Sequence, residues 1–327
     1  MSGIIGVIID KTKILVAGAG AVGSWLGAAL AAEGMDVTFL GRAATQVRLG
    51  GGLAITGLGA ELTLAQPKVV ASTDEAFDYV ILACKRQDTQ TLISSLSALW
   101  QHGPAIMVAQ NGLGAAEQVK ALTGCAVYPL MVPFNLQWLG AGLLHQGTGG
   151  QVVVPEQLAS FAPYWHAKVV ADMAPILAGK LLLNLNNAIN GLCGLPLVEE
   201  LSTRGYRQVL AAAQREALAV FAKLSISPAR LTGAPPSWLP RVLEMPDSLF
   251  KKLAKGLLAM DSNARSSLYD DLAGKRPTEV DYLNGWVAEQ AEHLGLKAPV
   301  NRHLAALVHQ AEQQGQAPQY APADLWP

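Results

Sequence analysis

The hydrophobic residues in the first half of the chain form short, unbroken runs separated by segments with helical periodicity. Ile14–Ala17, Tyr79–Ala83 and Ala105–Ala109 are almost wholly apolar, as expected for parallel strands that are covered on both faces. Asp36–Leu40 predicts a further strand, and Thr89–Trp100 predicts a helix. Short apolar strands that alternate with helices predict right-handed βαβ units and a doubly wound α/β sheet.

Weaker patterns lie between and beyond these elements. Leu62–Leu64 and Lys68–Val70 are candidate strands, and the glycine-rich residues 41–55 are typical of a loop. From about Val127 to Val154, the sequence predicts antiparallel hairpins that cap the sheet. The proline-rich residues 227–241 predict a loop between helices.

In the second half of the chain the strand pattern nearly disappears and a helical one replaces it. Residues 178–192, 206–224 and 279–296 repeat their apolar positions with the spacing of a helix. We therefore expect two domains, an α/β domain over residues 1–172 and an all-helical domain over residues 173–327.

The charged and cysteine residues exclude several classes of protein. Among the 327 residues, 24 lysines and arginines face 25 aspartates and glutamates, so the chain lacks the excess positive charge typical of proteins that bind nucleic acid or anionic membranes. Cys84, Cys125 and Cys193 show neither metal-binding nor disulfide spacing, which favours a cytoplasmic location and no metal site. Residues 1–12 lack the basic start of a signal peptide, and no role is assigned to them.

A glycine-rich turn separates the first predicted strand from the helix that follows it. Gly18, Gly20 and Gly23 match the pattern G-x-G-x-x-G in the strand–turn–helix context that gives this pattern its meaning. Gly18 permits the tight turn, Gly20 lets a pyrophosphate approach the backbone, and Gly23 lets the helix pack closely on the strand. The N–H groups at the helix N-terminus attract the anion. The expected cofactor-binding residues of the turn are Gly18, Ala19, Gly20, Ala21, Val22 and Gly23.

The same region allows a second interpretation, because residues 14–32 carry no charge and approach the ~18–20 residues of a membrane span. The glycines stand at the end of the strand-like part rather than throughout the run, and an alanine-rich segment of ordinary helix length follows them. A strand, a turn and a helix fit this arrangement better than one long helix. We therefore expect a Rossmann-like dinucleotide-binding domain and no association with a membrane.

The residue after the second strand indicates which dinucleotide binds. An NAD site usually has Asp or Glu there to bond the ribose 2′-hydroxyl, whereas this chain has Gly41 and Arg42. A guanidinium at this point suits a 2′-phosphate. The sequence predicts NADP(H), with a plain surface role as the alternative for Arg42.

Lys180 lies in a predicted helix that otherwise consists of leucine, alanine and asparagine. Burial in such surroundings lowers the pKa of a lysine and suits it to proton donation. Asn184 lies on the same helix face at i+4, and Asn187 falls close to it at i+7. The alternative is a lysine whose ammonium reaches solvent, with asparagines that serve the helix end or the core.

A second group of polar residues spans residues 266–285. Pro277 at the first position of a helix, with Glu279 in the first turn, is a good capping sequence. Glu279 is therefore either a carboxylate that interacts with the helix dipole or a catalytic group, and the residues alone leave both open.

Taken together, these motifs resemble the ketopantoate reductase family over nearly the full chain. The motifs that carry the resemblance are the glycine turn, ACK at Ala83–Lys85, QNGLG at Gln110–Gly114, GKLLLN at Gly179–Asn184 and SSLYDDLAGKRPTEVDYLNG at Ser266–Gly285. The last three are rather specific in combination. The resemblance implies a Rossmann domain followed by a helical domain similar to the C-terminal domain of 6-phosphogluconate dehydrogenase. It implies reduction of 2-dehydropantoate (ketopantoate) to pantoate by NADPH, in pantothenate biosynthesis.

The resemblance also implies roles for single residues. Lys180 matches the catalytic lysine of the family and Glu279 its active-site carboxylate, with Glu279 also beside the cofactor. Asn111 matches an asparagine beside the nicotinamide and the substrate, and Lys85 matches a lysine near the cofactor. The substrate-binding residues that follow from the motifs are Asn111, Asn184, Asn187 and Ser267.

Two departures from the family pattern leave alternatives open. The family often places a second asparagine four residues after Asn184, where this chain has Ala188, and residues 233–246 form a longer segment than usual. The alternatives are a reductase of another small 2-keto acid and a protein that senses NADP(H) without turnover. The retained Lys180 and Glu279 argue against the second, because sensing requires neither. The apolar pattern of the helical half allows a homodimer.

Overall fold

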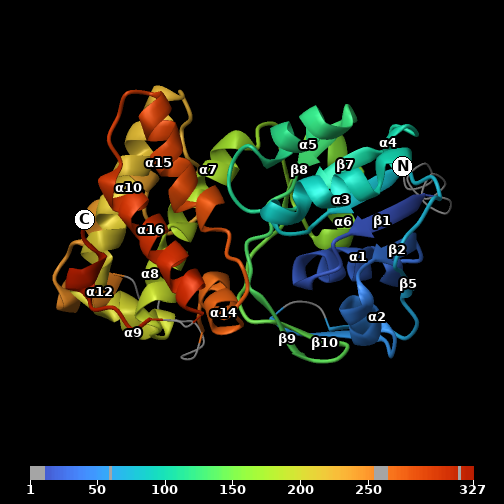
Figure 1. Ribbon diagram of the computed structural model, residues 1–327, viewed down its shortest axis with the longest axis horizontal. Helices are drawn as coiled ribbons and strands as arrows, with labels where there is room; N and C mark the ends of the chain where they lie inside the picture. Colours follow the sequence, from blue (N-terminus) through green and yellow to red (C-terminus); the bar gives the residue numbers. More distant parts are fainter. Residues whose placement is uncertain (1–11, 59–60, 254–263, 316–317) are drawn as a thin grey trace. The chain divides into compact units, whose positions relative to one another are not determined.

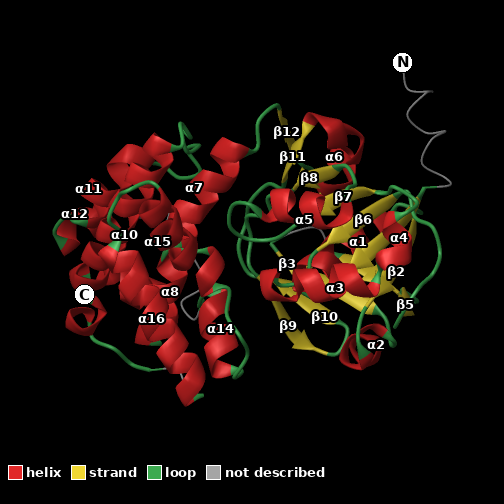
Figure 2. Cartoon of the chain, turned by 45° about the horizontal axis from the view of Figure 1, so that its top comes forward, coloured by secondary structure: helices red, strands yellow, loops and turns green. Residues whose placement is uncertain are grey.

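The computed structural model describes residues 12–58, 61–253, 264–315 and 318–327 (Figure 1). By its internal contacts the chain divides into two compact units. An α/β unit comprises residues up to Gln110 and from Gly114 to Met173, and a helical unit comprises Asn111–Leu113 and Ala174–Pro327. Figure 2 shows that the strands belong to the first unit and that the second is built from helices and loops. The unassigned N-terminal residues 1–11 lie outside the described part of the chain.

The main sheet of the α/β unit is parallel throughout, with the strand order β5-β2-β1-β6-β7-β8. Its strands are β1 Lys13–Ala17, β2 Asp36–Leu40, β5 Lys68–Val70, β6 Tyr79–Leu82, β7 Ala105–Val108 and β8 Val127–Pro129. The order reverses between β1 and β6, which is the point where doubly wound sheets bind nucleotides.

Helices cover both faces of this sheet, and strand β1 shows why its residues are apolar. Ile14 and Val16 pack into one core with Leu26 and Leu30 of helix α1, which spans Ala21–Ala32. Leu15 and Ala17 face a separate core that contains Ile93, Leu96, Leu99 and Val119. The helices that supply this second core are α3 Thr89–Ser95, α4 Ser97–Trp100 and α5 Ala115–Thr123. The predicted doubly wound fold is confirmed.

Two smaller sheets complete the unit. One has the order β4-β3-β10-β9, and the other pairs β11 with β12. Their strands are β3 Leu53–Gly57, β4 Leu62–Leu64, β9 Leu136–Gly140, β10 Leu143–Gln146, β11 Val153–Pro155 and β12 Lys168–Val170. Helix α6 Ala162–Trp165 and the 3-10 helices η1 Arg86–Asp88 and η2 Glu156–Phe161 lie between the strands.

Three predictions in this half need correction. Residues 41–55 contain helix α2 Ala43–Leu49 and most of β3, because Leu49 and Leu53 enter the core and the three glycines form only the turn between them. Only β9 and β10 form the expected antiparallel hairpin, since β8 and β11 pair in parallel with β7 and β12. The helix predicted over Thr89–Trp100 breaks at Leu96, whose φ and ψ of −114° and 26° are not helical.

The helical unit follows, as the periodicity predicts. Its α-helices are α7 Ala174–Asn184, α8 Asn186–Cys193, α9 Leu197–Ser202, α10 Arg204–Lys223, α11 Leu239–Leu243, α12 Asp247–Leu253, α14 Ser267–Ala273, α15 Asn284–His293 and α16 Pro299–Gln314. Its 3-10 helices are η3 Pro236–Trp238, η4 Val280–Tyr282 and η5 Pro322–Leu325. In the described residues, no helix has the length and apolar character needed to cross a membrane.

The boundaries differ from the predicted ones in three places. The segment 178–192 is two helices that meet at Leu185. The segment 279–296 is divided at Leu283, whose φ and ψ of −114° and −96° are far from helical. Pro277 is not the first residue of a helix, because η4 begins only at Val280. The loop predicted over 227–241 turns helical from Pro236.

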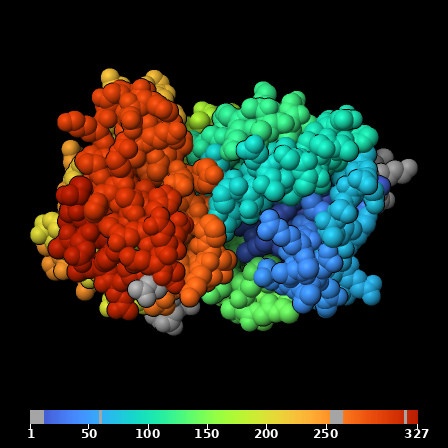
Figure 3. Space-filling view, in the orientation of Figure 1, coloured from blue at the N-terminus to red at the C-terminus, as the bar shows by residue number. Residues whose placement is uncertain are grey.

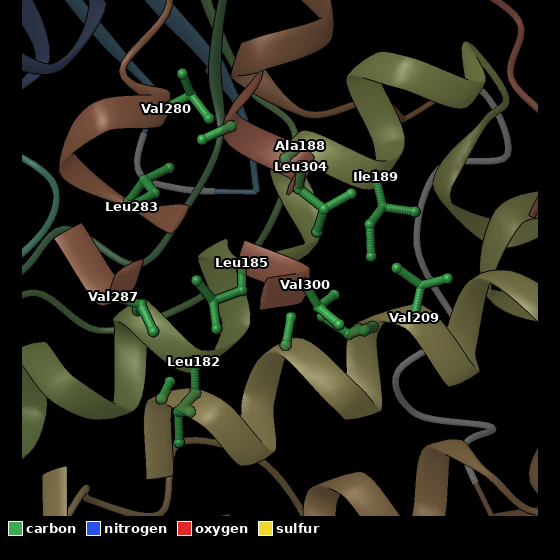
Figure 4. Packing of buried hydrophobic residues seen from close by; sticks show 14 of the residues in the cluster. Leu182, Leu185, Ala188, Ile189, Val209, Val280, Leu283, Val287, Val300 and Leu304 are labelled. Carbon is green, nitrogen blue, oxygen red and sulfur yellow. The ribbon is translucent and has the colours of Figure 1, made fainter. Parts of the chain in front are cut away.

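One hydrophobic core holds the helical unit together (Figure 4). Leu182 and Leu185 pack there with Ile189 of α8, Val209 of α10 and Leu304 of α16. Val280, the first residue of η4, and Leu283, which follows η4, enter the same core, so the short segment that carries Glu279 is anchored on its inner side. In the view of Figure 3, segments after residue 264, orange to red, form much of the surface of this unit.

Candidate functional site

The glycine turn after β1 is shaped by backbone contacts. Gly18 has φ +100°, and a Cβ there would lie 2.4 Å from the backbone nitrogen of Cys84. A Cβ at Gly23 would lie 2.4 Å from the carbonyl oxygen of Gly18 and 2.9 Å from a methyl group of Val16. Both glycines are therefore required by the close approach of β1, α1 and the segment after β6.

Gly20 differs from these two glycines, because a Cβ at this position would meet nothing within 4 Å. Gly20 is the N-cap of α1, is exposed, and has no side chain to bond the N–H groups of the first turn, where Ala21 and Val22 lie partly buried. Ala19 is buried, and its N–H bonds the carbonyl of Leu40. Open space beside a 12-residue helix N-terminus fits a bound pyrophosphate.

Arg42 and Lys85 follow the carboxyl ends of β2 and β6, the strands on either side of β1. Arg42 is exposed and is the N-cap of α2, with extended backbone. Lys85 is partly buried at the start of η1. The structure thus places the glycine turn, Arg42 and Lys85 at the same edge of the sheet, where ligands of doubly wound folds bind.

In the turn after β7, the chain passes from the α/β unit to the helical unit between Gln110 and Asn111. Gln110 belongs to the α/β unit, where its amide donates to the carbonyl of Cys84 at 2.9 Å and to Oγ1 of Thr89 at 2.8 Å. Asn111–Leu113 pack with the helical unit, and Leu113 enters its core. Gly112 has φ +84°, and a Cβ there would lie 2.4 Å from the carbonyl oxygen of Tyr282.

This close approach brings Asn111 between Lys180 and Glu279. Lys180 Nζ donates to Asn111 Oδ1 at 2.9 Å, and Asn111 Nδ2 donates to Glu279 Oε2 at 3.1 Å. The three side chains come from a turn, from α7 and from the N-cap of η4. The helical unit therefore contains a hydrogen-bonded lysine–amide–carboxylate cluster formed by three residues that the sequence singles out.

Burial lowers the pKa of Lys180 from its ordinary value of 10.5 to about 8, and the negative charge of Glu279 opposes this shift. A lysine with this pKa is mostly protonated at neutral pH and releases its proton more readily than an exposed lysine. The cluster can therefore donate a proton to an oxygen that gains negative charge.

The other predicted substrate residues lie on neighbouring elements of the same unit. Asn184 ends α7 and Asn187 lies in the first turn of α8, both partly buried, and Ser267 is exposed at the start of α14. Ala188 has no exposed surface and packs in the core, so an asparagine at that position would point into apolar side chains rather than to a ligand.

Sequence reasoning missed the residues that support these positions. Ser266, next to Ser267, caps α14 by accepting from the N–H of Tyr269, and its own N–H donates to Asn190 Oδ1 at 2.8 Å. Asn190 in turn donates to Glu200 Oε2 at 2.7 Å. A serine before a helix is a recognisable cap signal, but the pairing of Asn190 with Glu200 depends on tertiary packing.

Glu200 is completely buried, and burial raises the pKa of its carboxyl from 4.5 to about 8, against the hydrogen bonds of Asn190 and Asn186. Within the described residues, no cluster of His, Cys, Asp and Glu could hold a metal ion. Lys180 and Glu200 of the helical unit each have a pKa of about 8, which is below the ordinary value for the lysine and above it for the glutamate.

Comparisons with known proteins cover both units. Residues 14–157 match the family model described as Ketopantoate reductase PanE/ApbA, and residues 172–312 match the model of its C-terminal part. The chain is 26% identical over 315 residues to the 2-dehydropantoate 2-reductase of Archaeoglobus fulgidus, covering 92% of this chain and 98% of the relative.

Two solved structures share the fold over almost the whole chain. A PanE/ApbA family ketopantoate reductase from Ralstonia eutropha JMP134 superposes with a TM-score of 0.78 at 23% identity, covering 93% of this chain and 99% of that one. D-mandelate dehydrogenase with NADH and anilino(oxo)acetate superposes with a TM-score of 0.79 at 21% identity, with the same coverage. At these identities the structures establish a common fold.

Proposed function

Since the chain belongs to the ketopantoate reductase PanE/ApbA family, we propose that it is an NADPH-dependent reductase that converts 2-dehydropantoate to pantoate. Two of the relatives named for this activity match over more than nine-tenths of the chain. The observation that carries the proposal is the cluster of Lys180, Asn111 and Glu279, because it provides a proton donor of lowered pKa in the helical unit.

Lys180 is the residue to which we assign proton transfer. NADPH, when bound, supplies the hydride for the C2 carbonyl carbon of the keto acid. The ammonium of Lys180 stabilises the negative charge that develops on the carbonyl oxygen and donates its proton there. The neutral amine then regains a proton from solvent, which a pKa of about 8 makes favourable at neutral pH.

Asn111 and Glu279 are assigned to holding Lys180 in position. Asn111 Oδ1 accepts from the ammonium, and the carboxylate of Glu279 fixes the amide so that its oxygen faces the lysine. Asn184, Asn187 and Ser267 are assigned to orienting a small polar acid by hydrogen bonds. The cofactor contacts predicted for Asn111 and Glu279 are part of the same proposal.

The residues of the α/β unit are assigned to the dinucleotide. The open space at Gly20 and the N-terminus of α1 suit the pyrophosphate, and Arg42 suits the 2′-phosphate of NADPH. Lys85 adds positive charge at the same edge of the sheet. On this basis residues 1–172 bind the cofactor and residues 173–327 bind the substrate and supply the proton.

A second candidate is the reduction of another 2-keto acid. D-mandelate dehydrogenase, which shares this fold, favours this candidate. The segment 233–246 also favours it, since this segment carries η3 and α11, and Trp238 on η3 is 57% exposed. The buried position of Ala188 removes the other argument for it, since that residue does not face a ligand.

One assay separates these functions. The purified protein is mixed with NADPH or NADH and with 2-dehydropantoate or a panel of small 2-keto acids, and the loss of reduced cofactor is followed by absorbance. We expect the highest kcat/KM with 2-dehydropantoate and NADPH. A clearly higher value for another keto acid would support the second candidate, and binding of NADPH without turnover of any acid would support a sensing protein. Light scattering on the same sample tests the predicted homodimer.

A further inference from the structure

Helix α16 forms hydrogen bonds to the segment 278–282, which carries Glu279. Two hydrogen bonds reach it from this helix, one on each side of Glu279. Glu312 Oε1 accepts from the N–H of Thr278 at 2.7 Å, and His309 Nε2 lies 2.8 Å from Asp281 Oδ1. His309 Nδ1 lies 3.0 Å from Glu312 Oε2, so the imidazole joins the two contacts into one chain of bonds.

The partners of His309 determine its protonation. Carboxylates accept hydrogen bonds and do not donate them, so both ring nitrogens must carry a proton for both bonds to form. Burial lowers the pKa of His309, but its bonds to Glu312 and Asp281 outweigh this effect and the pKa is raised above 6.5. Near pH 6 the ring is therefore a cation between Asp281 of η4 and Glu312 of its own helix.

The inner side of the same segment is anchored independently. Val280 is 1% exposed in the helical core, and the carbonyl of Tyr282 lies against Gly112. Between these anchors the carboxylate of Glu279 reaches Asn111. Its position relative to Lys180 thus depends on where the backbone of residues 278–282 lies.

We propose that His309 is a positioning residue, which clamps the segment 278–282 through Asp281 and Glu312 and so keeps the carboxylate of Glu279 on the cluster of Asn111 and Lys180. This inference deepens the proposed function, on which the meaning of the cluster for catalysis rests. The clamp itself consists of contacts within the helical unit and can be tested without turnover.

The acidity of Lys180 gives a readout that a merely structural histidine would not change. The charge of Glu279 raises the pKa of Lys180 against the effect of burial. If the clamp is removed and the carboxylate moves away, the pKa of Lys180 falls and a larger fraction of the amine is unprotonated near pH 6. The rate at which a small electrophile such as cyanate modifies Lys180 measures this fraction, because only the free amine reacts.

The experiment compares modification of Lys180 near pH 6 and near pH 9.5, measured by mass spectrometry of the peptide. The rate at the higher pH reports access to the amine. The ratio of the rate near pH 6 to the rate near pH 9.5 therefore reports the acidity of the ammonium. We expect His309→Ala to raise the ratio by roughly 5- to 10-fold, as a loss of nearby charge does. Glu279→Gln should raise it similarly, and the double variant should exceed neither.

Arg302→Ala is the matched control, because Arg302 also joins α16 to a neighbouring element, through Glu292 of α15 at 2.6 Å, without touching residues 278–282. It should leave the ratio unchanged. His309 is 41% exposed, and ion pairs at such sites contribute little to stability, so His309→Ala should remain folded. If it does not, Asp281→Asn removes one side of the clamp and should raise the ratio by a smaller factor.

A wild-type ratio in folded His309→Ala, together with a raised ratio in Glu279→Gln, would overturn the clamp. An unchanged ratio in Glu279→Gln would overturn it too, since Glu279 would then not act on Lys180. Failure of the proposed reduction would be seen in the separate keto-acid assay and would leave these labelling results as they stand.

Discussion

The glycine turn and the lysine cluster occupy different units and are built from different parts of the chain. The turn consists of six consecutive residues whose backbone is assigned to binding the pyrophosphate. Its shape follows from the absence of side chains at Gly18 and Gly23. The cluster consists of side chains at positions 111, 180 and 279, which are 69 and 168 residues apart along the hydrogen bonds that join them. A local backbone motif can be recognised in the sequence, whereas a cluster of distant side chains exists only after folding.

The largest expected effect separates chemistry from cofactor binding. Lys180→Ala removes the proton donor, so we expect kcat to fall by roughly 10²–10⁴-fold, as for loss of a general acid. The glycine turn lies in the other unit, so the Kd for NADPH should stay within about twofold. Stopped-flow turnover and fluorescence titration measure the two quantities.

Lys223→Ala, at the exposed end of α10, is the control for this variant and should behave as wild type. Near-normal turnover in Lys180→Ala would refute the catalytic role of the lysine.

The second prediction concerns stability within the helical unit and leaves the turn untouched. Glu200 has a raised pKa of about 8 in the folded protein and an ordinary one in the unfolded chain. Between about pH 4.5 and 8 the unfolded chain has lost a proton that the folded protein keeps, so stability falls as pH rises through this window. Glu200→Gln carries no charge and should escape this loss.

We expect the free energy of unfolding of Glu200→Gln to exceed that of wild type by roughly 2–4 kcal/mol at pH 8 and to show no such gain near pH 4.5. Urea unfolding at several pH values tests this. Glu199→Gln, one residue away and exposed, should show no pH-dependent gain. A difference that is constant with pH would mean that Glu200 is ionised in the folded protein.

The third prediction is the converse of the first. A Cβ at Gly20 meets no protein atom, so Gly20→Ala should fold and melt as wild type. The methyl group would occupy the space assigned to the pyrophosphate, and we expect the Kd for NADPH to rise about 10- to 100-fold while kcat at saturation changes little.

Calorimetric titration and thermal melting measure these two effects. Gly51→Ala is the matched control, since a Cβ there also meets nothing within 4 Å and Gly51 lies outside the turn. Unchanged NADPH affinity in Gly20→Ala would remove the pyrophosphate from this position.

The smallest expected effect sharpens the description of the α/β unit. Arg42→Ala should weaken NADPH binding about 10-fold and leave NADH binding unchanged, because only NADPH has the 2′-phosphate. Arg48→Ala on the same helix, whose guanidinium lies 4.9 Å over the ring of Trp138, is the control. If NADH binding falls equally in Arg42→Ala, the arginine does not read the 2′-phosphate.

Much of the fold could be predicted, because its strands are continuous apolar runs with two covered faces. The failures lie where tertiary contacts decide. Leu49 and Leu53 turn a glycine-rich loop into a helix and a strand by entering a core, and Leu283 interrupts a periodic helix. The lysine cluster could be predicted in part, since Lys180 stood out as a charge in apolar surroundings. The roles of His309 and Glu200 could not, because each depends on a partner from another element, Asp281 of η4 and Asn190 of α8, which the local sequence does not reveal.

The sequence by itself determined the strand–turn–helix of the dinucleotide site, since the glycines act through local backbone geometry at Gly18 to Gly23. It also determined which half of the chain is helical, through the spacing of apolar residues. Only the tertiary structure decided that Asn111 lies between Lys180 and Glu279. It also decided that Ala188 faces the core. The same holds for His309, which joins Asp281 to Glu312. The physical reason is that the charge and hydrogen bonding of a side chain depend on neighbours brought from distant positions, which local sequence does not specify.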